Sequence, residues 1–339
     1  MHSSSCTILA IESSCDDTSA AIIKDGIMLS NIVATQEIHR KYGGVVPELA
    51  SRAHQQNIVP VVQAALEQAN IGKNDLNAVA YTQGPGLLGS LLVGCSFAKS
   101  LSLALSIPLL AIDHMQAHVL AHFIEDPKPN FPFLCLTVSG GHTQIVLVES
   151  TLRMKVIGRT IDDAVGEAFD KSAKMLNLPY PGGPLVDKLA QTGNPLAYKF
   201  SKTQVEGLNF SFSGIKTSIL YFLKENTAID PDFIQKNLAD ICASIQQALI
   251  NMLIEKLVKA VDQTNIKQVA IAGGVSANSG LRSRMQLLAL ERGLEVFIPK
   301  LEYCTDNAGM IAMAAHFKYQ EGIFADLKSG PNPRMNSFI

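Results

Sequence analysis

Two histidines stand four residues apart in the segment His114-Met115-Gln116-Ala117-His118. On a helix, residues at i and i+4 share a face, so both imidazoles could bind one metal ion. The spacing is that of the zinc-protease motif HExxH, but Met115 stands where that motif has its general base, a glutamate. A metal site without that base suits a Lewis-acid or templating role better than peptide hydrolysis. Two unrelated histidines on one helix are the alternative.

A metal site of this kind needs a third ligand, and Asp306 in the segment Thr305-Asp306-Asn307-Ala308-Gly309 is the candidate. A carboxylate at a strand–helix junction would supply an oxygen ligand and leave coordination positions open for a substrate. The alternative is that Asp306 only caps the helix that begins near Asn307.

Three turns built from small residues are candidate phosphate-binding sites. They are Ser13-Ser14, Ser139-Gly140-Gly141-His142 and Gly273-Gly274. Backbone N–H groups in glycine-rich turns can hold phosphate oxygens because no Cβ blocks their approach. Hairpins need the same residues, so each turn alone is a weak indication. In a chain with repeated α/β units, the three together predict a nucleotide held between two domains.

The segment Gly84-Pro85-Gly86-Leu87-Leu88-Gly89 matches the GxGxxG pattern of dinucleotide-binding sites. It follows a predicted strand and opens a predicted helix, and Asp113 ends the next strand, where such sites carry an acidic residue. However, the motif lies in an interior unit of the chain, and Asp113 runs directly into the histidine pair. A nicotinamide or flavin enzyme is therefore the less favoured interpretation.

Acidic residues form two further groups. Asp163, Glu167 and Asp170 would share one helical face, where they could accept hydrogen bonds from ribose hydroxyls or simply favour the helix N-terminus. Asp16 and Asp17 could hold a cation, although solvated turn residues are the simpler interpretation.

The elements that carry these residues follow a repeated order. An apolar run, a polar turn and a second apolar run occupy residues 7–23, and the same order returns at residues 134–148. Each half then holds a strand, a glycine-rich turn and the start of a helix, at residues 78–88 and 269–281. Such pieces occur in any α/β protein, but their order also fits the internal duplication of one α/β domain.

Helices and loops are readable between these units. Helical periodicity predicts helices at residues 53–69, 163–176 and 238–264. Residues 86–112 are long and apolar enough for a membrane span. Lys99 and Pro108 interrupt this stretch, so we interpret it as a buried helix followed by a strand. Residues 177–209 are rich in Pro and Gly and are predicted to form an ordered loop region over a site.

The composition excludes several classes of protein. Of 339 residues, 47% are hydrophobic and only 17% are charged, so the chain can bury two cores and is not disordered. A net charge of -2 excludes a generally basic, nucleic-acid-coating protein, but not a local basic patch or a partner that supplies one. The six cysteines form no CxxC pair and no signal peptide is visible, so we expect a cytoplasmic protein.

Eight motifs in order make the chain similar to one known family. They are ESSCDDT at 12–18, GGVVPELASRAH at 43–54, GPGL at 84–87, HMQAH at 114–118, VSGGHT at 138–143, GEAFDK at 166–171, FSFSGIKT at 210–217 and GGVSAN at 273–278. The family is the bacterial TsaD (Gcp) branch of the tRNA threonylcarbamoyladenosine transferases. The resemblance extends from residue 7 to beyond Asp306, with Ile215 where the family pattern has Leu.

The resemblance implies an α/β, duplicated RNase H-like fold of the actin, hexokinase and Hsp70 class (ASKHA), with the active site in an interdomain cleft. We expect domains at residues 1–112 and 113–316, the segment 317–339 packing back on the first and a helical and loop segment inserted at 160–235. The implied reaction transfers a threonylcarbamoyl group from threonylcarbamoyl-AMP to N6 of adenosine 37, in tRNAs that read codons beginning with A. The product is t6A, and AMP is the leaving group.

The resemblance also implies two sets of site residues. His114, His118 and Asp306 would bind one Fe²⁺ or Zn²⁺ ion, and no catalytic residue is assigned beyond these ligands. The residues expected to hold the adenylate, with ATP or ADP as further ligands, are Thr137, Val138, Ser139, Gly140, Gly141, Asp170, Gly183, Asp187 and Asn278.

Family members act on tRNA together with a paralogous non-catalytic partner (TsaB-like) and a P-loop ATPase (TsaE-like), and we expect no membrane partner. Two interpretations from other classes stay open. One is a metal-dependent O-sialoglycoprotein endopeptidase, against which Met115 argues. The other is a non-catalytic ATP-binding scaffold, which would not need the three metal ligands.

Overall fold

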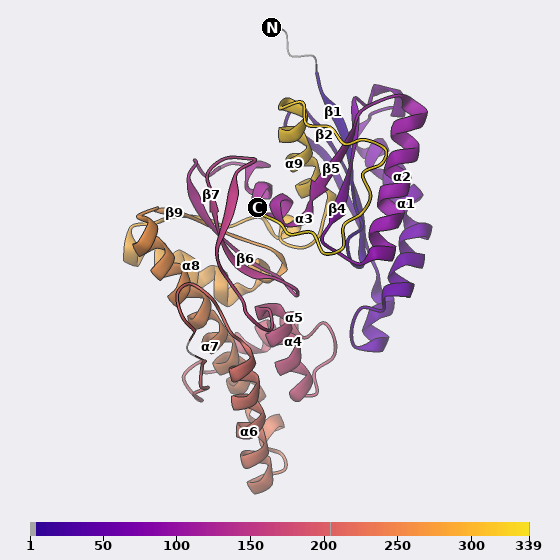
Figure 1. The fold of residues 1–339 in the computed structure, drawn as a ribbon. Helices are drawn as coiled ribbons and strands as arrows, with labels where there is room; N and C mark the ends of the chain where they lie inside the picture. Colours follow the sequence, from indigo (N-terminus) through magenta and orange to yellow (C-terminus); the bar gives the residue numbers. More distant parts are fainter. Residues whose placement is uncertain (1–4, 204, 339) are drawn as a thin grey trace. The chain divides into compact units, whose positions relative to one another are not determined.

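The computed structural model describes residues 5–203 and 205–338, apart from the side chains of Glu37 and Arg40. The chain divides into two compact units. Unit 1 comprises Met1–Lys128, Ser150–Met154 and Pro299–Ile339, and unit 2 comprises Pro129–Glu149 and Lys155–Ile298. Each unit is built on one five-stranded mixed sheet, with helices packed against it (Figure 1).

The sheet of unit 1 has the strand order β3-β2-β1-β4-β5. The strands are β1 Thr7–Glu12, β2 Asp17–Lys24, β3 Ile27–Thr35, β4 Ala78–Gly84 and β5 Leu109–Asp113. β1 pairs antiparallel with β2 and parallel with β4, and β4 pairs parallel with β5. Every residue of the central strand β1 is buried because elements cover both faces of the sheet. The acidic side chain of Glu12, at the end of this strand, is therefore enclosed as well.

Helices lie on both faces of this sheet (Figure 1). They are α1 Pro47–Ala69, α2 Leu88–Leu105, α3 His114–Leu120 and α9 Ala308–Gln320. α1 and α2 contact each other, and their core with the sheet contains Leu9, Ile11 and Tyr81. α9 packs against β1 and β2, with α3 beside it. Because side chains alternate along a strand, β1 contributes to both layers.

The segment after α9 lies along the strands β4 and β5 of unit 1. The N–H of Ala325 donates to the carbonyl of Leu109 (2.8 Å), and that of Asn332 donates to the carbonyl of Gln83 (2.7 Å). Ser337 Oγ then donates to Asp113 Oδ1 (2.9 Å), at the start of α3.

The sheet of unit 2 has the strand order β10-β9-β6-β7-β8. The strands are β6 Phe133–Val138, β7 Thr143–Val148, β8 Met154–Arg159, β9 Gln268–Ala272 and β10 Glu295–Phe297. The helices are α4 Val165–Met175, α5 Gly182–Ala190, α6 Ser213–Ile229, α7 Phe233–Thr264 and α8 Ser279–Arg292. One core joins alternate residues of β6, such as Leu134 and Leu136, to Leu249 and Leu253 of α7. Short 3-10 helices are η1 Glu37–Tyr42, η2 Lys73–Asp75, η3 Ala121–Phe123, η4 Gly274–Ala277 and η5 Leu301–Tyr303.

The two sheets share one topology. Written from the opposite edge, the order in unit 2 is β8-β7-β6-β9-β10, so that β6 corresponds to β1, β7 to β2 and β9 to β4. The strand directions agree too, because β6 pairs antiparallel with β7 and parallel with β9. The predicted duplication of one α/β unit is confirmed by this shared order.

The structure differs from the sequence-based expectation in two places. The units do not divide at residues 112 and 316, because α9 packs on the sheet of unit 1 and α3 packs on α9. Residues 177–209 also contain a helix, α5, and are not a loop throughout. Glycine and proline at the start of α5 made the sequence look like a loop.

Two helices, α2 and α7, are long and apolar enough to cross a membrane by length and composition alone. Core helices of soluble proteins pass the same test, and 67% of the apolar window in α7 is buried inside the structure. Residues 86–112 form α2 followed by β5, which confirms the predicted helix and strand. Only 33% of the apolar window in α2 is buried, so the helix is less buried than expected.

Candidate functional site

The short helix α3 presents the two histidines. It begins directly after β5, and Asp113 caps it by accepting hydrogen bonds from the N–H groups of Met115 (2.8 Å) and Gln116 (3.0 Å). The helix therefore starts at His114 and places His118 one turn later on the same face. The ring centroids of the two histidines lie 4.7 Å apart, with the rings nearly perpendicular.

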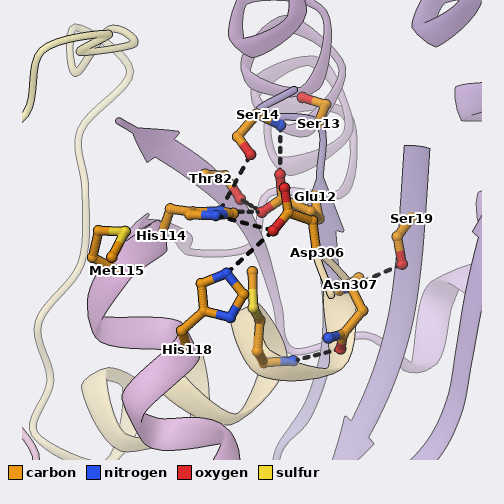
Figure 2. A network of polar contacts seen from close by, with 12 residues as sticks. Glu12, Ser13, Ser14, Ser19, Thr82, His114, Met115, His118, Asp306 and Asn307 are labelled. Carbon is orange, nitrogen blue, oxygen red and sulfur yellow. Dashed lines mark hydrogen bonds and ion pairs between the residues drawn. The ribbon is translucent and has the colours of Figure 1, made fainter. Parts of the chain in front are cut away.

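Asp306 meets both histidines from the start of α9. Its Oδ1 lies 3.1 Å from His118 Nε2 and 3.4 Å from His114 Nε2 (Figure 2). One potential ligand atom from each of the three residues lies within 4.8 Å of the other two. The structure thus brings together the three predicted metal ligands, all within unit 1.

Asp306 does not cap α9. The cap is Asn307, whose side-chain oxygen accepts a hydrogen bond from the N–H of Met310 (3.1 Å). The two N–H groups between Asn307 and Met310 have other partners. That of Ala308 donates to Ser19 Oγ (2.8 Å), and that of Gly309 donates to Asn31 Oδ1 (3.0 Å). The interpretation of Asp306 as a plain helix cap is therefore wrong, and its carboxylate is available to the histidines.

A second carboxylate, that of Glu12, contacts His114 from the other side. Glu12 Oε2 lies 3.0 Å from His114 Nδ1 and also accepts a hydrogen bond from Thr82 Oγ1 (2.6 Å). Glu12 Oε1 accepts a hydrogen bond from the N–H of Ser14, and Ser14 Oγ lies 3.2 Å from His114 Nδ1. Sequence reasoning placed Glu12 in a motif but gave it no role.

The charges of this group shift the pKa values of its members. Burial alone would lower the pKa of His114, but the carboxylates of Asp306 and Glu12 raise it well above its usual value. Burial alone would raise the pKa of Asp306, but His114 and His118 hold it well below its usual range. The pKa of Glu12 is likewise lowered by His114 against the effect of burial.

The donor set fits a divalent transition-metal ion. Two imidazole nitrogens and one carboxylate oxygen are ligands that Zn²⁺ and Fe²⁺ accept, and three protein ligands leave coordination positions for a substrate. The second nitrogen of His114 is held by a carboxylate, which is the common arrangement around metal-bound histidines. Met115 is 2% exposed and points away from the three ligands (Figure 2), so no residue takes the place of the protease glutamate at that position.

The glycines of the GxGxxG segment serve close packing of the chain. A Cβ on Gly84 would collide with the carbonyl of Asn332, and a Cβ on Gly86 would collide with that of Ser14. The N–H of Gly86 donates to the carbonyl of Pro333 (3.2 Å). Protein atoms therefore occupy the space that a dinucleotide would need, which argues against a nicotinamide or flavin site.

The predicted phosphate-binding turn of unit 2 is open on its outer side. It follows β6, and the N–H of Ser139 donates to the carbonyl of His142 (2.8 Å). A Cβ on Gly140 or Gly141 would meet no atom within 4 Å. The first turn of α4 packs against the same turn, where the N–H of Gly166 donates to the carbonyl of Ser139 (3.2 Å).

A second turn follows the neighbouring strand β9. Gly273 has a positive φ of 88°, and a Cβ there would lie 2.5 Å from the carbonyl of Val138, the residue after Thr137. A Cβ on Gly274 would meet open space. Because β6 and β9 are parallel neighbours, their two turns lie at the same edge of the sheet.

The other predicted nucleotide residues of unit 2 have protein partners. Asp170 Oδ1 accepts hydrogen bonds from the N–H groups of Gly182 (2.9 Å) and Gly183 (3.0 Å) and so caps α5. The carboxylate of Asp187 binds the N–H (2.9 Å) and hydroxyl (2.7 Å) of Ser279 at the start of α8.

Asn278 is the N-cap of α8. It accepts a hydrogen bond from the N–H of Leu281 (2.9 Å) and donates to Gln246 Oε1 (2.7 Å). Glu167 and Asp163, by contrast, form ion pairs with Lys171 at 2.8 and 2.6 Å. α4 begins at Val165, so Asp163 lies before the helix, and the prediction that Asp163, Glu167 and Asp170 share one helical face is wrong.

The fold places the chain in a class of proteins built from two RNase H-like units, the ASKHA class. Solved structures with this arrangement include full-length HypF, at a TM-score of 0.62 and 13% identity, covering 93% of this chain and 46% of that one. Another is component A of the (R)-2-hydroxyglutaryl-CoA dehydratase of Acidaminococcus fermentans, at a TM-score of 0.55 and 16% identity, covering 93% and 98%. At these identities the likeness shows the fold alone.

The family follows from sequence comparison. A family model for TsaD, tRNA N6-adenosine threonylcarbamoyltransferase, matches residues 27–313. The enzyme of that name from Cytophaga hutchinsonii is 63% identical over 334 residues, which cover 98% of this chain and 97% of the relative. The one from Christiangramia forsetii is 65% identical over 322 residues, covering 94% and 95%. The chain belongs to the TsaD family, which confirms the resemblance seen in the motifs.

Proposed function

We propose that this protein transfers a threonylcarbamoyl group to N6 of an adenosine in tRNA. The observation that carries the proposal is the convergence of His114, His118 and Asp306 in a chain that shares the length of its TsaD relatives. The finer assignments are threonylcarbamoyl-AMP as donor, adenosine 37 of tRNAs that read codons beginning with A as acceptor, t6A as product and AMP as leaving group.

His114 Nε2, His118 Nε2 and a carboxylate oxygen of Asp306 would hold one Fe²⁺ or Zn²⁺ ion. Such an ion supplies Lewis-acid stabilisation and a template for oxygen ligands when it is bound. Asp113 caps the helix that bears both histidines. We assign no further catalytic residue.

The adenylate would be held in unit 2. A Cβ on Gly140, Gly141 or Gly274 would meet open space, so phosphate oxygens could approach the backbone of these turns. Thr137, Val138 and Ser139 shape the first of these turns. The other four predicted residues already form hydrogen bonds at the starts of α5 and α8. They would contact the nucleoside only by sharing those polar groups, and they are Asp170, Gly183, Asp187 and Asn278. ATP or ADP would use the same turns.

The chemistry needs no strong nucleophile from the protein. A carbamoyl–phosphate anhydride is already activated, so the protein has to orient it, stabilise charge on the departing phosphate and aim the adenine amine. A net charge of -2 fits a tRNA site that is shared with partners. A TsaB-like paralogue, a TsaE-like ATPase and a cytoplasmic location remain predictions from the family.

Two rival functions are less consistent with the site. An HExxH-type endopeptidase needs a general base beside its first histidine, and Met115 there is buried and has no titratable group. A non-catalytic ATP-binding scaffold gives no reason for three convergent ligand atoms in unit 1.

Reconstitution tests the proposal. The protein is incubated with TsaB-like and TsaE-like partners, threonylcarbamoyl-AMP and unmodified tRNA, and the tRNA nucleosides are analysed by mass spectrometry. We expect t6A only when this chain is included. Absence of t6A, under conditions in which the relative from Cytophaga hutchinsonii forms it with the same partners, would contradict the proposal.

A further inference from the structure

Glu12 is an acidic residue whose side chain is fully buried at the end of β1, with 0% exposure. A carboxylate in such a place is stable in its charged form only when hydrogen bonds replace the lost water. Both oxygens are compensated here: Thr82 Oγ1 and His114 Nδ1 approach Oε2, and the N–H of Ser14 donates to Oε1. Two distant segments of unit 1, at Thr82 and His114, therefore converge on this side chain together with the turn that follows β1.

We propose that Glu12 is a positioning residue for the metal site: it fixes the ring and the tautomer of His114 so that Nε2 faces Asp306. The proposal rests on the proposed metal-binding role of His114, His118 and Asp306. It assigns Glu12 a task in addition to the three ligands, carried out through its hydrogen bond to the far side of the ring (Figure 2).

The tautomer argument follows from the donors and acceptors present. A histidine that binds a metal ion must be neutral, and a neutral imidazole carries one N–H and one lone pair. Because a carboxylate only accepts, His114 Nδ1 must carry the proton to bond with Glu12 Oε2, which leaves the lone pair on Nε2. The opposite tautomer would set the lone pair of Nδ1 against the Glu12 carboxylate and turn an N–H toward the site.

The geometry also separates Glu12 from the ligands themselves. The ring of His114 bridges the two carboxylates, since its Nδ1 contacts Glu12 at 3.0 Å and its Nε2 contacts Asp306 at 3.4 Å. The oxygens of Glu12 already accept from Ser14, Thr82 and His114. Carboxylates that hold the second nitrogen of a metal-bound histidine orient the ring and increase its basicity.

The variant Glu12→Gln tests this role because it keeps the shape and changes the hydrogen bonds. If the amide NH₂ faces His114, Nδ1 must accept and the proton moves to Nε2, where it blocks metal binding. If the NH₂ instead faces the N–H of Ser14, two donors oppose each other in a buried site. We expect the affinity for Zn²⁺ to fall by about 10–100-fold, measured by competition with a chelator.

Thr82→Val is the matched control. It removes another hydrogen bond to Glu12 Oε2 and nearly conserves the volume, but it leaves the carboxylate and its bond to His114. We expect Thr82→Val to change Zn²⁺ affinity less than threefold. If the site only required every hydrogen bond of the buried group to be intact, Thr82→Val and Glu12→Gln would lose similar Zn²⁺ affinity.

A second measurement needs no variant and decides the question if Glu12→Gln does not fold. In the Zn²⁺-loaded wild-type protein with ¹⁵N-labelled histidine, NMR should show His114 with its proton on Nδ1 and Zn²⁺ on Nε2. Zn²⁺ on Nδ1, or unchanged Zn²⁺ affinity in a folded Glu12→Gln variant, would overturn the positioning role alone. A wild-type protein that binds no Zn²⁺ or Fe²⁺ would instead overturn the metal site on which it depends.

Discussion

Asp306 Oδ1 lies 3.1 Å from His118 Nε2, although 188 residues separate them in the chain. The contact depends on two helix starts: α3 begins after β5, and α9 begins at a separate cap, Asn307. Since the cap is a different residue, Asp306 is free to act on the histidines. Because Asn307 caps α9 and Asp306 contacts the histidines, substitutions at these two neighbouring positions should have different effects on helix stability and on metal binding.

Asp306→Asn should weaken metal binding and transfer while leaving α9 intact. Asn keeps the shape but removes the charge, so we expect Zn²⁺ affinity to fall by at least about tenfold, on the scale seen for weakened metal sites. Equilibrium titration with Zn²⁺ and single-turnover transfer measure the two effects. Asn307→Ser is the control, because Ser is about as good a cap as Asn and adds no charge beside the site. Equal behaviour of the two variants would contradict the assignment of Asp306.

His118→Ala should remove most bound metal with little change in secondary structure. The ring is a ligand candidate that contacts Asp306, and α3 keeps its cap at Asp113. Met115→Leu is the matched control on the same helix, since it nearly conserves volume and the side chain of Met115 points away from the three ligands (Figure 2). Elemental analysis of the purified variants measures the effect. Full metal occupancy in His118→Ala would exclude His118 as a ligand.

Gly141→Ala and Gly166→Ala should separate ligand binding from folding in unit 2. A Cβ on Gly141 meets open space, so the fold should tolerate it while ADP binding weakens. A Cβ on Gly166 would lie 2.6 Å from the carbonyl of Ser139. Overpacking of this kind costs about 1–3 kcal/mol, which exceeds the gain of about 0.5–1 kcal/mol that Ala gives in a helix.

Thermal unfolding and ADP titration of both glycine variants provide the measurements. A Gly141→Ala variant that binds ADP as tightly as the wild type would show that the turn after β6 does not hold the nucleotide. A Gly166→Ala variant of unchanged stability would show that the close contact between α4 and this turn can relax.

Asp17 should make stability depend on pH in the metal-free protein. Burial, together with the charges of Asp16 and Asp306, raises the pKa of Asp17 from 3.8 to about 7. The folded state thus binds its proton more tightly than the unfolded state. The resulting stabilisation is complete below pH 3.8 and is lost as the pH rises through about 7.

Asp17→Asn removes this titration. Its melting temperature relative to the wild type should therefore be higher at pH 8 than at pH 5.5. Differential scanning calorimetry of both proteins at the two pH values measures the change. The same difference at both pH values would mean that Asp17 titrates normally in the folded protein.

Much of the fold could be predicted because local pattern decides it. The apolar runs of β1 and β6, the Asp25-Gly26 turn between β2 and β3, and the i, i+4 histidines of α3 are signals within a few residues. The helix α5 was missed because its start is held by a distant side chain, that of Asp170.

The site was only partly predictable for the same physical reason. The histidine pair has a local signature, and Asp306 was a candidate third ligand that the motif resemblance supported. Nothing local reveals that Glu12 lies against His114, 102 residues later. Contacts between the ends of separate strands and helices become visible only when the sheet is assembled.

The most direct test of the central claim follows the transferred group itself. Threonylcarbamoyl-AMP labelled in its threonyl part is mixed with excess protein, its partners and unmodified tRNA, and a single turnover is followed in time. We predict label on N6 of adenosine 37 and release of one AMP for each group transferred, with loss of both in the double variant His114→Ala, His118→Ala. Equal transfer by the double variant, or label that never leaves the adenylate in the wild-type reaction, would contradict the account.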